Sequence, residues 1–101
     1  MTGHRDHPIE DLATVVVPDA QLIDVRQPDE VVDGMLDGAV NIPLGQLADR
    51  LDELDPDRRT VVVCRSGARS STAARLLVGA GFGDVVNLAG GMLAYAQGVP
   101  R

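Results

Sequence analysis

The segment VVVCRSGARSS, residues 61–71, contains the only cysteine of the chain, Cys64, with Arg65 and Arg69 close behind it. The reactive form of cysteine is the thiolate, which forms more readily beside cationic groups or at a helix N-terminus. This combination predicts a nucleophilic cysteine in a site that binds anions. Because a single cysteine excludes an internal disulfide, the chain also suits a reducing compartment.

A purely structural role for Cys64 is the alternative. Free cysteine is among the most buried residue types, and one that follows three valines could be the last core residue of a strand. A glycine, a serine and two arginines are nevertheless among the next five residues, 65–69, and a helix start follows them. A core strand requires none of these features, so the segment favours the functional interpretation.

The residues after Cys64 are expected to form a tight loop between a strand and a helix. The apolar run 60–64 predicts the strand, and the hydroxyl residues from Ser70 onward predict the helix start. Gly67 allows the backbone between them to curl, which directs successive N–H groups inward as an anion nest. No histidine lies near Cys64 in the sequence, so we expect the loop itself to activate the thiol.

The elements that position this loop alternate between strands and helices. The strands are apolar runs, which is typical of buried parallel strands. The pattern predicts an α/β fold: one domain with a central, mostly parallel sheet of about four to five strands and helices on both faces. Strands are expected over 21–25, 38–43, 60–64 and 84–88, and helices over 8–13, 27–34, 44–54, 70–81 and 90–98.

Length and charge restrict the function further. A chain of 101 residues has room for one domain. We expect residues 1–7 to be a flexible N-terminal tail and residues 8–101 to be the domain. The net charge of −6 argues against nucleic acid or an anionic membrane as partner. No apolar run approaches a membrane span and the N-terminus lacks the apolar core of an export signal, so we expect a cytoplasmic location.

The basic residues are unevenly distributed. All nine are arginines, and five of them lie between Asp57 and Asp84, in a stretch without any acidic residue. Cys64 lies inside this stretch, so the sequence predicts a positive segment around the thiol. His4 and His7, in contrast, are expected to be solvated tail residues rather than metal ligands, because no further ligand completes a site.

Four segments, in order along the chain, resemble the motifs of the rhodanese family of sulfurtransferases, its single-domain members in particular. The resemblance covers roughly residues 9–99 and implies a rhodanese-like domain without a metal or organic cofactor. It implies that the Cys64 thiolate takes the outer sulfur of thiosulfate or a low-molecular-weight persulfide and passes it to cyanide, a thiol or a protein. Such a double displacement predicts ping-pong kinetics. The segments are LIDVRQPDE, GMLDGAVNIPL, VVVCRSGARSSTAARLL and VVNLAGGMLAY.

The same resemblance implies roles for individual residues. Arg65 and Arg69 would orient the anionic donor. Asp24 and Arg26 would brace the sheet edge beside the loop, and the glycines at 90 and 91 would allow a close approach of the chain rather than contact substrate. The backbone N–H groups that would hold the persulfide sulfur are those of Arg65, Ser66, Gly67, Ala68, Arg69 and Ser70.

The chain departs from the family's pattern at the second motif and near the C-terminus. Met35, Leu36 and Asp37 stand where the family often has His-Ile-Pro, and Tyr95 stands where tryptophan is usual. An aromatic residue is frequent near Val31. We expect these differences to alter the pocket wall and the acceptor preference.

Two other functions compete with sulfur transfer by turnover. A cysteine-dependent phosphatase has a similar loop, but of the wider C-x5-R type, whereas Cys64 and Arg69 are separated by four residues. The shorter loop favours a single sulfur atom over a tetrahedral phosphate. The other alternative is a rhodanese-like sulfur carrier or protein-docking module that turns over small donors poorly.

Overall fold

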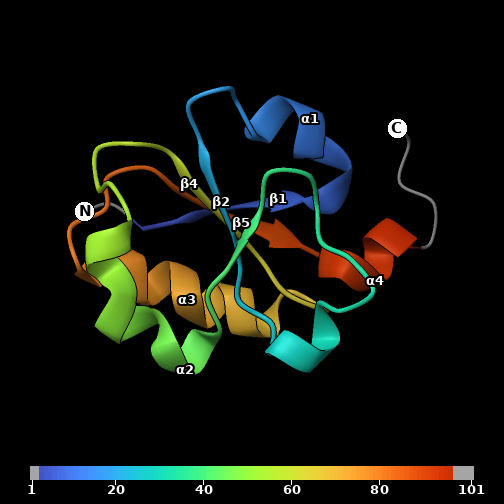
Figure 1. Cartoon of the computed structure of the whole chain (residues 1–101). Coiled ribbons are helices and arrows are strands. Elements are labelled where there is room, and N and C mark those ends of the chain that lie inside the picture. Colours follow the sequence, from blue (N-terminus) through green and yellow to red (C-terminus); the bar gives the residue numbers. More distant parts are fainter. Residues whose placement is uncertain (1–2, 97–101) are drawn as a thin grey trace.

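A five-stranded parallel sheet forms the centre of the molecule, which a computed structural model describes over residues 3–96 (Figure 1). The strand order across the sheet is β1-β5-β4-β2-β3, and every neighbouring pair is parallel. The strands are β1 Arg5–Pro8, β2 Gln21–Asp24, β3 Val40–Asn41, β4 Thr60–Val63 and β5 Val85–Ala89.

Helices cover both faces of the sheet. Figure 1 shows α1 and α4 on one face and α2 and α3 on the other. The predicted α/β class with a parallel sheet and helices on both faces is therefore confirmed. No helix among residues 3–96 is long and apolar enough to cross a membrane. The helices are α1 Leu12–Val15, α2 Leu44–Leu47, α3 Ala68–Gly79 and α4 Gly91–Ala96, with 3-10 helices η1 Ile9–Asp11, η2 Pro28–Glu30 and η3 Ala48–Glu53.

The core consists of two apolar layers, one on each face of the sheet. Successive residues of a strand point to opposite faces. Accordingly, Val61 and Val63 of β4 pack with the layer beneath α1 and α4, whereas Val62 packs with the layer beneath α2 and α3. Cys64 continues this alternation and joins the α3 layer. The strand therefore determines the face on which the thiol lies.

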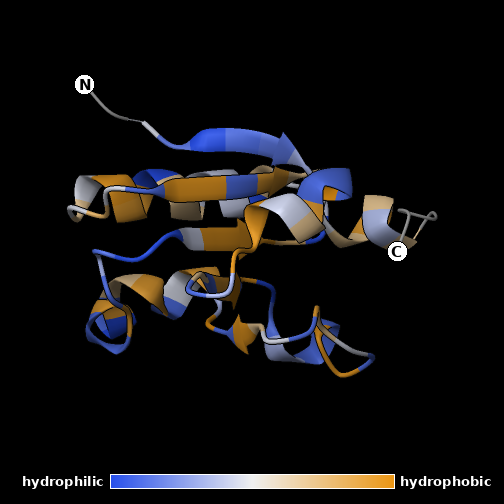
Figure 2. Cartoon of the chain, turned by 90° about the horizontal axis from the view of Figure 1, so that it is seen from above, coloured by the Kyte–Doolittle hydropathy of each residue, from blue (hydrophilic) through white to orange (hydrophobic). Residues whose placement is uncertain are grey.

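The predicted N-terminal tail is wrong over residues 5–7, which begin strand β1. This strand pairs with β5 in the register Arg5↔Val86 to Pro8↔Ala89, and Arg5 donates to Asp84 over 2.7 Å. The segment is polar (Figure 2), so it carries no apolar strand pattern, and its backbone pairing holds it at the sheet edge. A polar edge strand also discourages pairing with other chains. The ordered domain thus begins before Pro8.

Four predicted helices differ from those observed in their bounds or their type. The helix expected over 27–34 is a single 3-10 turn, and the one over 44–54 is divided into α2 and η3, with non-helical backbone at Arg50. Helix α3 begins at Ala68, two residues before the predicted start, because Gly67 adopts φ +106° and turns the chain directly into the helix. The last helix is observed to Ala96, and its predicted residues 97–98 lie outside the described part.

Candidate active site

Cys64 lies at the carboxyl end of β4, where ligands bind in open parallel sheets. The residue is 0% exposed and packs in the same layer as Ala73 and Ala74 of α3. The structural interpretation of the cysteine is thus correct about its burial. It does not account for the polar groups that surround the sulfur.

Three hydrogen-bond donors converge on the Cys64 sulfur. The Gly67 N–H donates to Sγ over 3.1 Å, and both the N–H and the hydroxyl of Ser70 donate over 3.3 Å. Of the other predicted donors, the N–H groups of Arg65, Ala68 and Arg69 make no hydrogen bond to Sγ in the part of the chain that the structure describes. The sulfur therefore lies in a cradle formed by the first turn of α3 and the loop before it.

Helix α4 holds the other side of this loop. The Met92 N–H donates to the Cys64 carbonyl, and the Leu93 N–H to the Arg65 carbonyl, each over 2.9 Å. In a trans peptide, the N–H points away from the preceding carbonyl. The two loop carbonyls point toward α4. The N–H groups of the same peptide units therefore point to the opposite side of the loop. The helix thus orients the peptide planes at the start of the cradle.

Gly91 makes this contact between α4 and the loop possible. Its φ is +56°, and an added Cβ would lie 2.4 Å from the Cys64 carbonyl oxygen and 2.6 Å from that of Arg65. No side chain fits at that distance. The prediction that this glycine permits a close approach of the chain is confirmed.

The cradle lowers the pKa of the Cys64 thiol. Burial alone raises this pKa, but the Ser70 hydroxyl and the N–H groups of Ser70, Gly67 and Ser66 lower it by more in combination. Hydrogen bonds to a thiolate stabilise its charge, which is why they outweigh the cost of burial. The thiolate is therefore favoured by donors of the loop itself, without a histidine.

Arg69 is paired with an acidic residue, Glu30, that could not be placed beside it from the sequence. Its guanidinium donates to both carboxylate oxygens of Glu30, over 2.6 and 2.8 Å, and 34% of the Arg69 side chain and 26% of the Glu30 side chain are exposed. Glu30 was missed because it lies 39 residues away in the sequence. The expectation that Arg69 orients the anionic donor remains a prediction, and in the structure its guanidinium is bound to Glu30.

Glu30 is itself held in place from two directions. Its carboxylate accepts the Gln27 N–H over 2.8 Å in a capping box that begins η2, and its carbonyl accepts from Arg26 over 3.2 Å. The Arg69 hydrogen bond, followed by that of the Gln27 N–H, lowers the pKa of Glu30 from 4.5 to about 2. The capping pattern around Gln27 could have identified Glu30 as a helix cap, although not as the partner of Arg69.

Asp24 and Arg26 form a buried ion pair beside the loop. Arg26 donates Nη2 to Asp24 Oδ2 over 2.7 Å and Nε to both carboxylate oxygens over 3.0 Å. The guanidinium also donates to the carbonyl oxygens of Glu30 and Gly34 over 3.2 and 3.0 Å. The pair ties the end of β2 to segment 28–34, which is a bracing position and not one in contact with the sulfur.

A cavity of about 420 Å³ opens beside the cysteine loop. Arg65 comes from the loop, and in the described residues its side chain has no hydrogen-bond or ionic partner. Apolar residues of α4 form one wall and the segment around η2 forms another. The lining residues are Arg26, Asp29, Glu30, Asp33, Gly34, Arg65, Met92, Leu93 and Ala96.

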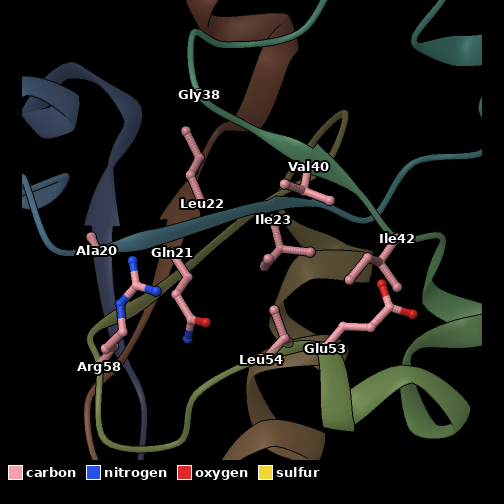
Figure 3. A pocket seen from close by; sticks show the side chains of 10 residues that line it. All are labelled: Ala20, Gln21, Leu22, Ile23, Gly38, Val40, Ile42, Glu53, Leu54 and Arg58. Atoms are coloured by element: carbon pink, nitrogen blue, oxygen red, sulfur yellow. The ribbon is translucent and has the colours of Figure 1, made fainter.

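A second cavity, of about 260 Å³, lies along β2 and β3 and includes the start of β2 (Figure 3), and none of its lining residues belongs to the cysteine loop. Its polar side chains already have partners: Gln21 donates to the Asp55 carbonyl, Arg58 to the Asp19 carbonyl, and Glu53 accepts from Arg50. This hollow therefore offers no unsatisfied group for chemistry.

The residues that depart from the family's pattern surround a third cavity, of about 210 Å³. Met35, Leu36, Asp37 and Tyr95 line it together with residues of α1. None of these four residues is among those that line the cavity beside the cysteine loop. Their position therefore gives no support to the expectation that they alter the wall of the cysteine pocket.

The chain is similar to known proteins over most of its length. The model of the Rhodanese-like domain family matches residues 10–97. A sulfurtransferase of Allochromatium vinosum is 42% identical over 83 residues, which cover 81% of this chain and 78% of that protein. The thiosulfate sulfurtransferase GlpE of Shewanella oneidensis is 40% identical over 77 residues, 76% of each chain. The crystal structure of a rhodanese-like domain protein from Staphylococcus aureus superposes with a TM-score of 0.82 at 28% identity, covering 90% of both chains.

Proposed function

The chain belongs to the rhodanese-like domain family, and on that basis we propose that it transfers sulfane sulfur through a persulfide on Cys64. The donor would be anionic, thiosulfate or a low-molecular-weight persulfide, and the acceptor cyanide, a thiol or a protein. The observation that carries the proposal is the convergence of three donors, from Gly67 and Ser70, on one sulfur atom at the carboxyl end of β4. Sulfurtransferases among the relatives support sulfur transfer in general.

The first half-reaction forms the persulfide. The Cys64 thiolate attacks the outer sulfur of thiosulfate, the S–S bond of the donor breaks, and sulfite leaves with the bonding electrons. The outer sulfur of the new persulfide inherits the negative charge, which the donors of the loop stabilise as they do the thiolate. Because Cys64 is 0% exposed, the loop has to open locally to admit the donor.

The second half-reaction returns the thiolate. An acceptor nucleophile attacks the outer sulfur, and Cys64 leaves with the electron pair of the S–S bond. Its lowered pKa makes it a better leaving group and increases the fraction of the thiol that is present as the nucleophilic thiolate. Because the donor product departs before the acceptor reacts, the kinetics are ping-pong. A reducing compartment such as the cytoplasm would keep the thiol free for each cycle.

Intact-mass spectrometry after incubation with thiosulfate tests this proposal. Wild type is expected to gain one sulfur atom, and cyanide or a thiol should remove it. Cys64→Ser should gain nothing, because the hydroxyl does not form a persulfide. A wild-type chain that stays unmodified with thiosulfate, with organic persulfides and with a persulfide-bearing protein would overturn the proposal.

A sulfur carrier is the second candidate, favoured by the complete burial of Cys64, which limits access of free donors. It predicts no persulfide with thiosulfate but a rapid gain of sulfur from a cysteine desulfurase. A phosphatase is disfavoured because the loop hydrogen bonds close around Sγ with four residues between Cys64 and Arg69. Hydrolysis of an aryl phosphate that is lost in Cys64→Ser would reverse that ranking.

A further inference from the structure

The charges around the mouth of the cysteine loop are mostly neutralised. Arg26 is paired with Asp24, and Arg69 is paired with Glu30. Within residues 3–96, Arg65 is the guanidinium at this cavity that has no partner. The loop that looks strongly cationic in the sequence thus offers an incoming anion one free positive side chain.

Two carboxylates oppose that single charge. Asp29 and Asp33 line the same cavity as Arg65, and neither has a hydrogen-bond or ionic partner in the described part of the chain. They repel a second negative charge on a donor. Met92, Leu93 and Ala96 contribute an apolar wall, and Leu93 is 39% exposed. A cavity of about 420 Å³ with such a wall has room for an organic group that thiosulfate lacks.

We infer that this site selects organic sulfur donors with a single negative charge over dianionic thiosulfate, and that Glu30 is the residue that sets this selectivity. The inference rests on the proposed function, since it concerns the donor of that same reaction. Glu30 acts through Arg69, because its carboxylate neutralises the Arg69 guanidinium. Arg69 is the residue directly before Ser70, which donates a hydrogen bond to the Cys64 sulfur. Glu30 is therefore a positioning residue that determines charge selectivity, without itself contacting the reacting sulfur.

The matched donors for a test are thiosulfate and methanethiosulfonate, which carry two charges and one. With methanethiosulfonate, the Cys64 thiolate attacks the terminal sulfur, the bond between the two donor sulfurs breaks, and methanesulfinate leaves with its electrons. One thiolate and one monoanion yield one persulfide anion and one sulfinate, so atoms and charge balance. With thiosulfate, the leaving group is sulfite, and the step at Cys64 is otherwise the same.

The measurement is the ratio of kcat/KM for thiosulfate to kcat/KM for methanethiosulfonate. In Glu30→Gln the amide oxygen can still accept the Gln27 N–H, but no carboxylate neutralises the positive charge of Arg69. The ratio should rise by about three-fold to ten-fold, the effect of one partly screened charge at close range. Because a disturbed loop would slow both donors, the ratio separates charge selectivity from structural damage.

A second variant removes charge without touching the ion pair. Asp33→Asn should raise the same ratio by about three-fold, because its carboxylate lines the cavity and has no partner among the described residues. The matched control is Glu53→Gln, which breaks a similar bidentate pair, with Arg50, around the cavity along β2 and β3. It should leave the ratio unchanged. Benzenethiosulfonate should also react better than methanethiosulfonate, and Leu93→Ser should abolish that difference.

Two results would overturn the inference, and they are distinguishable. If both donors form a persulfide on Cys64 but Glu30→Gln and Asp33→Asn leave the ratio at the wild-type value, the charge selectivity is refuted while the proposed function stands. If neither donor modifies wild-type Cys64, the proposed function fails for small donors and the inference fails with it.

Discussion

The Met92 N–H donates to the Cys64 carbonyl oxygen over 2.9 Å, so the start of α4 is bound directly to the cysteine loop. Twenty-seven residues separate these two groups in the sequence, from 65 to 91. The contact turns the loop carbonyls toward α4, and the first turn of α3 supplies donors to the sulfur on the other side. The cradle is therefore assembled from two helices, on opposite faces of the sheet.

Gly91→Ala should remove sulfur transfer. The new Cβ would meet the Cys64 carbonyl oxygen at 2.4 Å, in a backbone conformation that L-residues rarely adopt. Loop and helix must separate, which we expect to lower the free energy of unfolding by about 2 kcal/mol or more and to abolish persulfide formation. Urea unfolding and intact-mass spectrometry measure the two effects.

The control for this change is Gly81→Ala. Gly81 also has a positive φ, +97°, but an added Cβ would meet nothing within 4 Å. Gly81→Ala should also lower the free energy of unfolding through backbone strain, but it should still form the Cys64 persulfide. Equal loss of activity in both variants would show that general destabilisation, and not the contact between α4 and the loop, is responsible.

Ser70→Ala should raise the pKa of the Cys64 thiol, because the Ser70 hydroxyl lowers this pKa more than any other group of the loop does. A hydrogen bond to a charged group contributes about 1.5–3 kcal/mol, so persulfide formation at neutral pH should slow by about 10-fold or more. The rate of alkylation by iodoacetamide, followed against pH, reports the pKa directly. Its midpoint should move to higher pH in the variant.

Ser71→Ala is the matched control for Ser70. The neighbouring hydroxyl of Ser71 accepts a hydrogen bond from Arg75 on the exposed side of α3 and makes no hydrogen bond to Cys64 in the described structure. Its removal should leave the alkylation profile at the wild-type midpoint. The role assigned to Ser70 would be contradicted by coincident profiles for wild type and Ser70→Ala.

The Glu30–Arg69 pair should stabilise the fold near neutral pH and cease to do so in acid. The Arg69 hydrogen bond lowers the pKa of Glu30 from 4.5 to about 2, so over this interval the unfolded chain binds more protons than the folded one. The stabilisation is fully present above about pH 4.5 and is lost as the pH falls toward about 2. Because both side chains are partly exposed, it should be about 1 kcal/mol or less.

Urea unfolding of wild type and Glu30→Gln tests this pH dependence. The difference in the free energy of unfolding should be measurable at about pH 7 and should shrink by about pH 3. Asp33→Asn is the control, since that carboxylate has no partner in residues 3–96 and its removal should give no comparable difference at neutral pH. A difference for Glu30→Gln that is constant from neutral to acid pH would argue against the ion pair as its source.

The sequence predicts the parts of the site that are local and misses the parts that the fold brings together. The apolar run before Cys64 and the glycine at 67 are adjacent features, so the loop at the end of a parallel strand could be predicted. Strand β1 could not, because an edge strand needs backbone pairing and not an apolar pattern. Its polar residues instead resemble a solvated tail.

The charge of the site shows the same limit. The arginines between Asp57 and Asp84 indicate a positive segment, yet their acidic partners come from other parts of the chain. Arg59 is paired with Asp84 and Arg69 with Glu30. Local composition therefore overstates the positive charge around the thiol, and only the tertiary pairing reveals that Arg65 is the free guanidinium there among the described residues.

Asp24→Asn should destabilise the fold far more than loss of an exposed carboxylate. Asp24 is completely buried, and its carboxylate accepts three hydrogen bonds from the side chain of Arg26 and one from its backbone N–H. Removal of the negative charge leaves a buried guanidinium without its counterion, which costs about 3–5 kcal/mol. The substitution should also disturb the active site, because Arg26 donates a hydrogen bond to the Glu30 carbonyl.

Asp84→Asn is the matched comparison, because Asp84 also pairs with arginines but is 41% exposed. Asp84→Asn should lower the free energy of unfolding by about 1 kcal/mol or less. Urea unfolding measures the free energy of unfolding of both variants. The rate of persulfide formation with methanethiosulfonate, measured at low temperature where Asp24→Asn remains folded, gives the effect on the cysteine loop. Similar unfolding free energies for the two variants would mean that the buried pair does not brace the end of β2. Slower persulfide formation in folded Asp24→Asn alone would instead connect this pair, through segment 28–34 and Arg69, to the sulfur.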